Sequence, residues 1–542
     1  MKSNKVILGL LACFAISSCA DMDEMLPQGG GLTSEQMKET NESVPSRTEA
    51  TIAGMYSMMG KPNYTLGGTR ADDFGYIMNA ISMDLEASDM CIANSGYNWF
   101  SVCGEYTSRY ANYANPYIRY ASTYNQIKVA NEIIASFPAD VQTAEGKAKV
   151  GQAKAMRAFD YLSLAPYFQF NYATAKDGLC VPLVTENTQD FANNPRATVG
   201  QIYEQIINDL DDAIELLAEY DRGSDKARIN RQVAYGLRAR AYLNMGMYAE
   251  AAADAVKAME GYAPASMSDI STPSFCQLSE ANWIWGINID ASMVISNGYP
   301  TSSSWVSAFS SDGYAAACQC VPFINNLLYD KIPTTDVRKH WWLDENSYSP
   351  LLETIEWDGV SGAAISSMVI ENVKMEFLPY YNVKFGMKSG IGSTINNNDW
   401  CLMRAEEMIL IQIEGLAMSG QEAQAKDLLL NFVKQYRNPE YTISETRSLQ
   451  DEIWMQRRIE LWGEGFAMND IMRLGKPVVR FHANEYSNYP EAFRFNIAST
   501  DGWLLLRFPQ SETNTNLGIE DNTEGTLPVQ DQNGDLRDGV TD

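Results

Sequence analysis

Apolar residues recur at helical spacing in several separate blocks of this chain. In the clearest block, residues 198–217, Ile202, Ile206 and Leu210 fall on one face of a helix and acidic residues occupy the other. A helix with one apolar stripe must bury that stripe against a neighbour. The pattern therefore predicts a mainly α-helical body in which successive helices pack together. Further blocks with this periodicity lie at residues 47–59, 117–137, 145–168 and 403–436.

One further block carries the signature of a helical repeat. Small residues at fixed spacing let two antiparallel helices approach closely, as in a tetratricopeptide unit. Ala255 departs from the pattern, because a large aromatic residue is usual there. We therefore predict a tetratricopeptide-like scaffold of several irregular units. The Tyr, Gly, Tyr, Ala and Ala positions of the unit are occupied by Tyr242, Gly246, Tyr248, Ala251 and Ala258.

Two long stretches between the helical blocks, residues 60–115 and 265–400, differ in composition. They are rich in Gly, Ser, Asn, Tyr and Trp, and seven of the eleven tryptophans lie in the second stretch. We predict that both are irregular inserts with short strands, within a single body that spans residues 43–542. Strand-like pieces in the second insert are residues 283–289 and 368–373.

The first residues have the order of a secretory signal: Lys2 and Lys5, an apolar run at residues 6–16, and small residues before Cys19. The run is shorter than the ~20 residues that a membrane-spanning helix needs. Because it ends in Ile-Ser-Ser-Cys, it resembles a bacterial lipobox. We expect residues 1–18 to be removed and Cys19 to carry lipid. A plain signal peptide that is cut after a small residue is the alternative.

The segment that follows Cys19 is polar. Residues 19–42 contain three consecutive glycines and are predicted to form a lipid-anchored linker. The acidic residues 21–24 resemble the surface-export signal of Bacteroidetes lipoproteins, although a solvated spacer is the other interpretation. At the opposite end, the polar and acidic chain after Pro509 is expected to run over the surface or stay loose. We therefore expect a body that is held on a lipid and faces outward.

Composition narrows the possible chemistry. The formal net charge is −27, and phosphate backbones would repel such an acidic chain, so nucleic acid is excluded as a partner. His340 and His482 are the only histidines, and neither lies in a nucleophile or zinc motif. Motifs for phosphate or dinucleotide binding are absent, and we expect no cofactor. Among enzymes, a glycosidase that uses two carboxylates stays open.

The cysteines do not indicate a disulfide framework or a metal site. Seven follow Cys19, an odd number that cannot pair completely within the chain. Cys318 and Cys320 lack the second pair or nearby His that would complete four ligands. Most of the cysteines are therefore interpreted as small buried residues. Calcium binding by residues 531–535 stays open, because their oxygens alternate but the sixth-position Gly and the final Glu of a calcium loop are missing.

Several short motifs follow one another along the chain. The helical segment Ala155–Phe168 is followed by Val-Pro-Leu-Val-Thr-Glu at residues 181–186, and further motifs lie at 402–415, 456–476 and 504–516. In order and spacing they resemble the RagB/SusD family of outer-membrane nutrient-binding lipoproteins, and the lipobox agrees with this resemblance. The departures fall in segments that we interpret as scaffold. They are Gln456, Ala467, Met468 and Thr515.

The resemblance implies a binding protein that sits as a lid on a SusC-like TonB-dependent transporter. Such a protein captures a glycan and delivers it without chemistry. It is lipid-anchored in the cell outer membrane and exposed at the surface, with the repeat face toward the transporter and the inserts toward the ligand. The alternatives are a peptide-capture member of the same family, a surface glycosidase, and a scaffold that bridges surface proteins.

Aromatic and polar residues of the inserts are the candidates for ligand binding. Sugars stack their C–H faces on aromatic rings, and their hydroxyls bond to Asn, Asp and Arg. Core packing is the alternative for each aromatic residue. The predicted ligand-binding residues are Tyr97, Asn98 and Trp99 in the first insert, Trp305 and Tyr314 in the second, and Arg70 and Asp72 as hydroxyl partners.

A charged helix near the C-terminus resembles a catalytic cluster at first sight. It carries Arg457, Arg458, Glu460 and Glu464. Charges three or four residues apart on one helix are usually ion-paired supports. We interpret these residues as scaffold, with Gly475 as the stop of the helix that follows.

Overall fold

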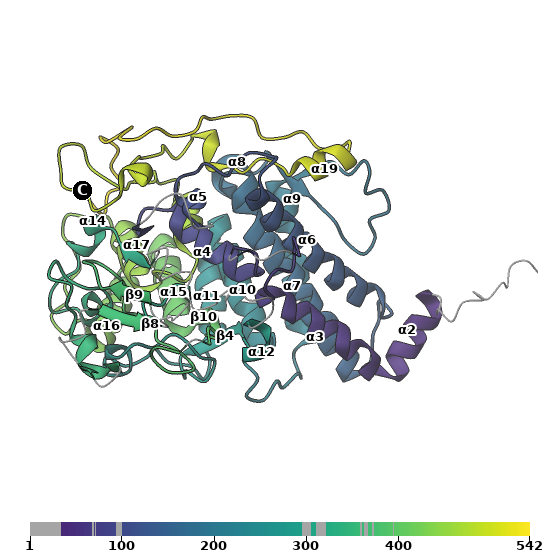
Figure 1. The fold of residues 1–542 in the computed structure, drawn as a ribbon. Coiled ribbons are helices and arrows are strands. Elements are labelled where there is room, and N and C mark those ends of the chain that lie inside the picture. Colours follow the sequence, from purple (N-terminus) through teal and green to yellow (C-terminus); the bar gives the residue numbers. More distant parts are fainter. Residues whose placement is uncertain are drawn as a thin grey trace, which may run out of the picture.

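The computed structural model describes residues 34–542, apart from 68–69, 71, 94–99, 295–304, 310–320, 358–359, 362–366, 371–372 and 394. The predicted signal peptide, Cys19 and the first part of the predicted linker lie outside the described residues. Long helices fill the right half of the molecule in Figure 1, and most of the loops and short strands lie in the left half. The fold is mainly α-helical, as the periodicity predicts.

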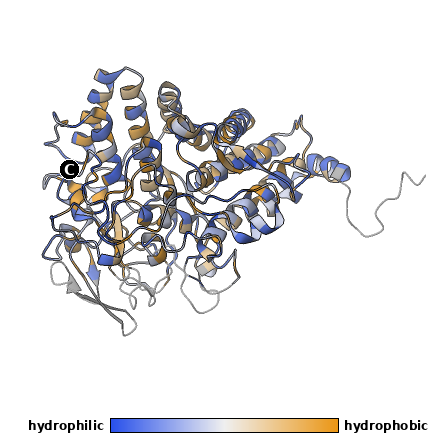
Figure 2. Cartoon of the chain, turned by 90° about the horizontal axis from the view of Figure 1, so that it is seen from above, coloured by the Kyte–Doolittle hydropathy of each residue, from blue (hydrophilic) through white to orange (hydrophobic). Residues whose placement is uncertain are grey.

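The helical scaffold consists of α6 (Ala114–Ala135), α7 (Ala144–Phe168), α9 (Val199–Leu216), α10 (Arg231–Met245), α11 (Tyr248–Ala258), α15 (Ala405–Met418) and α16 (Glu422–Tyr436). Each of these helices contacts the next one in this series. A succession of neighbouring helix pairs is the arrangement of a tetratricopeptide-like scaffold. Figure 2 shows that the helices carry both hydrophobic and hydrophilic residues, as helices with one buried face do.

Capping residues define the ends of these helices. The Thr198 side chain accepts a hydrogen bond from the Gln201 backbone N–H, and the Gln201 side chain accepts one from the Thr198 backbone N–H, which forms a capping box at the start of α9. Asn230 caps α10 in a similar way. Gly246, with a φ of 74°, ends α10 and turns the chain into α11. The repeat signature therefore marks a real helix pair.

The crossing of α11 and α15 depends on a glycine. A Cβ atom at Gly415 would lie 2.5 Å from the Tyr248 carbonyl oxygen and 2.8 Å from the Ala252 Cβ. Gly415→Ala should therefore push the helices apart and lower the free energy of unfolding by about 1–3 kcal/mol, measured by urea denaturation. Gly54→Ala in α3 (Glu49–Ser57) is the matched control, because a Cβ there meets nothing within 4 Å. Equal effects of the two substitutions would contradict this account.

The remaining elements surround the scaffold. The other helices are α2 (Ser34–Ser43), α4 (Tyr76–Glu86), α5 (Ser101–Gly104), α8 (Tyr172–Ala175), α12 (Ala291–Val294), α14 (Asn326–Tyr329), α17 (Leu449–Glu460), α18 (Ala467–Leu474) and α19 (Gln510–Thr515). The strands are β1 (Met90–Ile92), β2 (Leu179–Pro182), β3 (Arg196–Thr198), β4 (Trp283–Ile287), β5 (Pro322–Ile324), β6 (Glu356–Trp357), β7 (Val360–Ser361), β8 (Ser367–Ile370), β9 (Val373–Glu376) and β10 (Trp400–Arg404).

The strands form antiparallel pairs, and within the described ranges each sheet has two strands. The pairs β2–β3, β6–β7 and β8–β9 join segments close in sequence, whereas β4 pairs with β10. β1 of the first insert pairs with β5 of the second, with Cys91 opposite Phe323. The two predicted inserts are therefore joined to each other.

The first insert is more helical than its sequence suggests. Weak periodicity between residues 60 and 115 predicts an irregular segment, but α4 lies there, and every residue from Ile77 to Glu86 is buried. A helix that is buried on all sides has no solvent face, so its sequence lacks the broad charged face by which an amphipathic helix is recognised. This burial explains why the helix escapes sequence inspection.

The two ends of the described chain are tied to the body. α2 overlaps the end of the range 19–42 predicted to be linker, and the side chain of Asn41 donates a hydrogen bond to the Ser136 carbonyl oxygen at 3.2 Å. The described end of the predicted linker is therefore helical and contacts the body. At the other end, the chain after Pro509 runs along the top of the molecule in Figure 1. Buried Asp538 anchors it through an ion pair with Arg458 at 2.7 Å.

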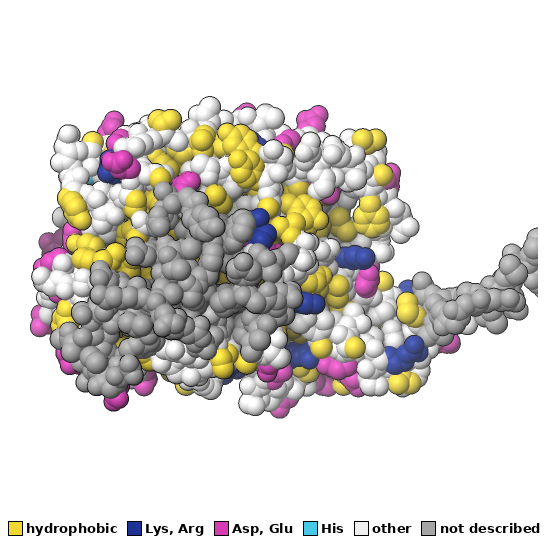
Figure 3. All heavy atoms as spheres, viewed as in Figure 1, with side chains coloured by type: hydrophobic (Ala, Val, Ile, Leu, Met, Phe, Trp, Pro, Cys, Tyr) yellow, Lys and Arg dark blue, Asp and Glu magenta, His cyan; other side chains and the backbone are white. Residues whose placement is uncertain are grey.

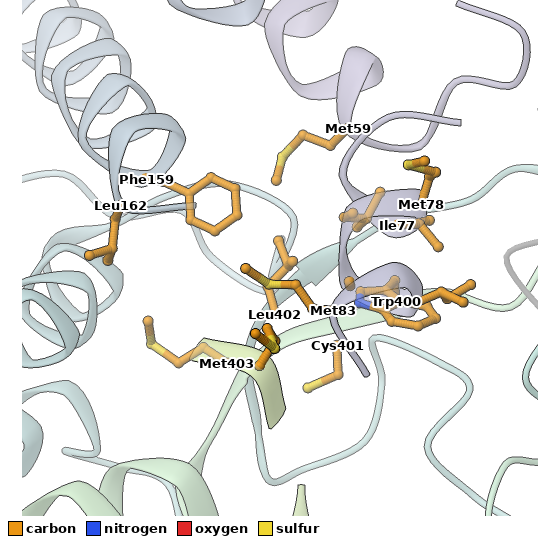
Figure 4. Packing of buried hydrophobic residues seen from close by; sticks show 14 of the residues in the cluster. Met59, Ile77, Met78, Met83, Phe159, Leu162, Trp400, Cys401, Leu402 and Met403 are labelled. Atoms are coloured by element: carbon orange, nitrogen blue, oxygen red, sulfur yellow. The ribbon is translucent and has the colours of Figure 1, made fainter. Parts of the chain in front are cut away.

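One large hydrophobic core joins the inserts to the scaffold. Figure 4 shows Ile77 and Met83 of the first insert in one cluster with Met59, Leu402 of β10 and Phe159 of α7. The Phe159 ring also contacts the Trp285 ring of β4, with centroids 5.0 Å apart. The described cysteines are unpaired and buried, in agreement with the sequence interpretation. Cys318 and Cys320 lie outside the described residues.

Candidate functional site

The two inserts meet at a cluster of aromatic rings. The ring centroids of Phe100, in the first insert, and Trp305, in the second, are 4.5 Å apart. Phe74 packs edge-on against Phe100 at 6.4 Å. The predicted residues Tyr97, Asn98 and Trp99 precede Phe100 in the chain and lie outside the described residues. The two inserts therefore meet at the contact between Phe100 and Trp305, of which Trp305 is a predicted ligand-binding residue and Phe100 is not.

Trp305 itself is a core residue in this structure. Its exposed fraction is 1%, as is that of Phe100. The prediction that Trp305 forms an exposed stacking surface disagrees with this burial. The physical reason is that the indole removes a large apolar area from water by packing against the Phe100 ring. Its Nε1 has no hydrogen-bond partner in the structure as described.

Arg70 and Asp72 form an ion pair instead of standing as two separate ligand contacts. The Arg70 Nε and Nη2 atoms donate to the two carboxylate oxygens of Asp72 at 2.9 and 2.8 Å. Asp72 is fully buried, and this burial raises its pKa although Arg70 partly counteracts it. The Arg70 side chain keeps 21% of its surface exposed. In this arrangement Asp72 orients the guanidinium, and only Arg70 reaches the surface.

Two residues that the sequence analysis missed hold the loop that carries Arg70. The Asp73 carboxylate accepts hydrogen bonds from the backbone N–H groups of Thr65 and Leu66, at 3.1 and 2.8 Å. The Asn63 side chain accepts one from the Arg70 backbone N–H at 2.9 Å. Asn and Asp close loops in this way because their short side chains reach backbone donors nearby. An Asn and an Asp flanking a Gly-rich stretch is the sequence signal that identifies this loop.

Four of the predicted ligand-binding residues lie outside the described residues. They stay predictions. They are Tyr97, Asn98, Trp99 and Tyr314.

The described residues do not bring together a group of His, Cys, Asp or Glu that could hold a metal ion. Asp531, in the segment considered for calcium, forms an ion pair with Arg494. The four charged residues singled out in the sequence are buried and paired with partners on other elements, as Arg457 is with Asp470 at 2.8 Å. The interpretation of these residues as scaffold is therefore confirmed, but through contacts between elements and not along one helix.

The described residues also line two large cavities that the sequence analysis did not foresee. One, of about 750 Å³, lies between α6, the loop that follows β2, and α19. The other, of about 810 Å³, lies beside Tyr110 and Trp503 at the C-terminal segment. Each is assembled from segments far apart in the chain, so periodicity and local motifs carry no signal for them.

Helices that could cross a membrane would show an apolar stretch long enough to span the hydrocarbon layer. Among the helices of the described ranges, none is both long and apolar enough for this.

Two protein-family models match the chain. A model described as "Starch-binding associating with outer membrane" matches residues 36–243. A model of the SusD family matches residues 361–526. None of the curated protein sequences compared with this chain matches it significantly.

Solved structures share the fold. A SusD-like carbohydrate binding protein from Bacteroides vulgatus is 23% identical, with a TM-score of 0.68 over 88% of this chain and 97% of that chain. Surface glycan-binding protein A from Bacteroides thetaiotaomicron, solved in complex with laminarihexaose, is 17% identical, with a TM-score of 0.62 over 88% of this chain and 99% of that chain. At these identities the likeness concerns the fold.

Proposed function

Because this chain belongs to the SusD/RagB family, we propose that it captures a glycan at the cell surface and delivers it to a SusC-like TonB-dependent outer-membrane transporter. The observation that carries the proposal is that both family models match, one over much of the helical scaffold and one over the C-terminal part. The glycan-binding protein with the same fold supports the ligand class. In this proposal the protein binds and releases its ligand without chemistry.

The insert site has the parts that glycan capture requires. Arg70 is held in place by the Asp72 carboxylate, so its partly exposed guanidinium is ordered before a ligand arrives. An ordered donor loses less conformational entropy when it binds a sugar hydroxyl. Tyr97 and Trp99 supply aromatic faces for stacking, and Asn98 supplies an amide. Phe100, which follows Trp99 in the chain, packs against Trp305 in the buried contact between the two inserts.

The anchor is part of the same proposal. Cys19 carries the lipid, and the polar residues that follow it lead to α2, which is already tied to the body. This arrangement holds the body at the outer membrane and faces the inserts outward. The scaffold helices then meet the transporter.

Titration calorimetry with laminarihexaose, maltohexaose and cellohexaose tests the capture of a glycan. We expect one or more to bind, and Trp99→Ala to weaken that binding at least tenfold, about 1.4 kcal/mol, because a stacking face is lost. Tyr486→Ala is the control, since Tyr486 is 71% exposed and lies outside the inserts. We expect no release of reducing sugar. Binding of peptides but of no glycan would contradict the proposal and favour peptide capture.

A further inference from the structure

The 750 Å³ cavity lies at the helical end of the molecule, away from β8 and β9 of the second insert. In Figure 1, α6 and α19 lie on the right, whereas β8 and β9 lie on the left. Figure 3 shows hydrophobic side chains exposed on the helical half of this face. The cavity volume falls within the roughly 300–1,000 Å³ of ordinary ligand pockets. Three segments line it: α6, the loop 183–195 after β2, and α19.

Aromatic and aliphatic side chains form its floor. The rings of Tyr120 and Tyr124, both on α6, have centroids 4.4 Å apart. The Tyr124 hydroxyl donates a hydrogen bond to the Pro182 carbonyl oxygen at 2.6 Å, which fixes the ring against the loop. Phe191 lies in the same lining with an exposed fraction of 61%. An exposed ring beside a lined cavity offers a flat apolar face to a ligand.

Hydrogen bonds hold the polar walls in fixed positions. Arg157, which is buried, donates to the Glu186 carboxylate at 2.5 Å and to the Asn131 side-chain oxygen at 2.6 Å. Asn516 accepts from the Asn194 backbone N–H at 2.9 Å and donates to Glu512 at 3.0 Å. The loop and α19 are thereby fastened to each other. Walls that are ordered in advance lose little entropy on binding.

The charges of the lining favour one class of ligand. The lining contains the carboxylates of Glu132, Glu186 and Glu512 and one cation, Lys128. Arg157 behind the wall pairs with Glu186, so the site keeps a net negative charge. This balance repels phosphates, sulfates and uronic acids. Carboxylates accept hydrogen bonds, so they fit a ligand that is rich in hydroxyl donors. The threonine hydroxyls and amides of the lining add both donors and acceptors.

We propose that this cavity is a second carbohydrate-binding site, which takes a short neutral oligosaccharide. The sugar stacks on the exposed face of Phe191, and its hydroxyls bond to Glu186 and Glu512. A peptide that adds a strand would need an exposed strand edge, whereas here side-chain acceptors and aromatic rings form the lining. The second site lets the protein hold a long glycan at two points.

The experiment separates the two sites by substitution. Laminarihexaose, maltohexaose and cellohexaose are titrated into wild type, Trp99→Ala, Phe191→Ala and the double variant. We expect Trp99→Ala to retain binding of at least one of these sugars, and Phe191→Ala to weaken that remaining binding at least tenfold in the double variant. Glu512→Gln in the Trp99→Ala background should weaken it by about threefold or more, because a neutral amide is a weaker acceptor.

Leu517→Ala is the matched control. Leu517 follows Asn516, is 81% exposed and does not line the cavity, so its truncation should leave every affinity unchanged. Loss of all sugar binding in Trp99→Ala would overturn the second site. The same holds if the residual binding in Trp99→Ala is unchanged when Phe191→Ala is added. Binding of a basic peptide at this cavity, with no binding of any of the three sugars, would also overturn it. The proposed capture at the inserts is judged separately, by the effect of Trp99→Ala on wild-type binding.

Discussion

Glu460→Ala is expected to lower the free energy of unfolding by about 3–5 kcal/mol, because it leaves buried cations without their shared partner. The Glu460 carboxylate is fully buried and lies 2.8 Å from Arg404, 2.7 Å from Arg437 and 3.2 Å from Arg338. Burial alone would raise the pKa of Glu460, but the guanidinium groups of Arg437 and Arg404 outweigh it and hold that pKa well below its usual value. The carboxylate is therefore charged at neutral pH.

Denaturation in guanidinium chloride, followed by circular dichroism, measures this loss. Glu422→Ala is the control, because the Glu422 carboxylate pairs with Lys426 on the exposed face of α16. Such a surface pair contributes about 0.2–1 kcal/mol. Glu460→Gln should lie between the two, since it keeps hydrogen-bond acceptors but loses the charge. A loss in Glu460→Ala no larger than that in Glu422→Ala would show that the network does not hold the scaffold to the inserts.

Stability should be highest near pH 4–5 and should fall as the pH rises toward 7. Burial raises the pKa of Asp84 to about 7, although the carboxylate accepts hydrogen bonds from the Gly465 and Ala467 backbone N–H groups. Burial also raises the pKa of Glu280 to about 7. Between the ordinary carboxyl values near 4 and these raised values, the folded state keeps protons that the unfolded chain has released. The free energy of unfolding therefore falls with pH across this interval.

The two carboxyls together should contribute on the order of 8 kcal/mol to this fall, at about 1.4 kcal/mol for each unit of pKa shift. Asp72, whose pKa burial also raises, acts in the same direction. Half-buried His340 opposes it below pH 6.5, because burial lowers its pKa. Below about pH 4.5 stability should fall again, since Arg404 and Lys384 outweigh burial and lower the pKa of Glu464, which must then be protonated.

Calorimetric melting temperatures at pH 5 and pH 8 test the predicted loss of stability with rising pH. Wild type should melt at a lower temperature at pH 8, and the double variant Asp84→Asn, Glu280→Gln should show a smaller difference. Glu204→Gln on the exposed face of α9 should leave the difference unchanged. A wild-type melting temperature that rises from pH 5 to pH 8 would mean that these carboxyls are ionised and well solvated in the folded state.

The candidate site could be predicted only in part from the sequence. Composition predicts that the inserts bind the ligand, and Arg70 keeps a partly exposed side chain there. The same reasoning assigned Trp305 to the ligand, although Trp305 is buried against Phe100. Composition counts aromatic residues but does not show which side of a ring faces solvent. That depends on contacts between segments about 200 residues apart, which no local pattern records.

The sequence by itself determined the helical scaffold. An amphipathic helix such as α9 can be recognised within about five turns of sequence, because its apolar stripe and its capping residue Thr198 are local features. Only the tertiary structure decided how β1 finds β5, how α4 is buried on every side, and how Asn194 and Asn516 close a cavity. These are contacts between segments far apart in the sequence. Their energies depend on burial and on neighbouring side chains from other elements, and neither leaves a periodic pattern in the sequence.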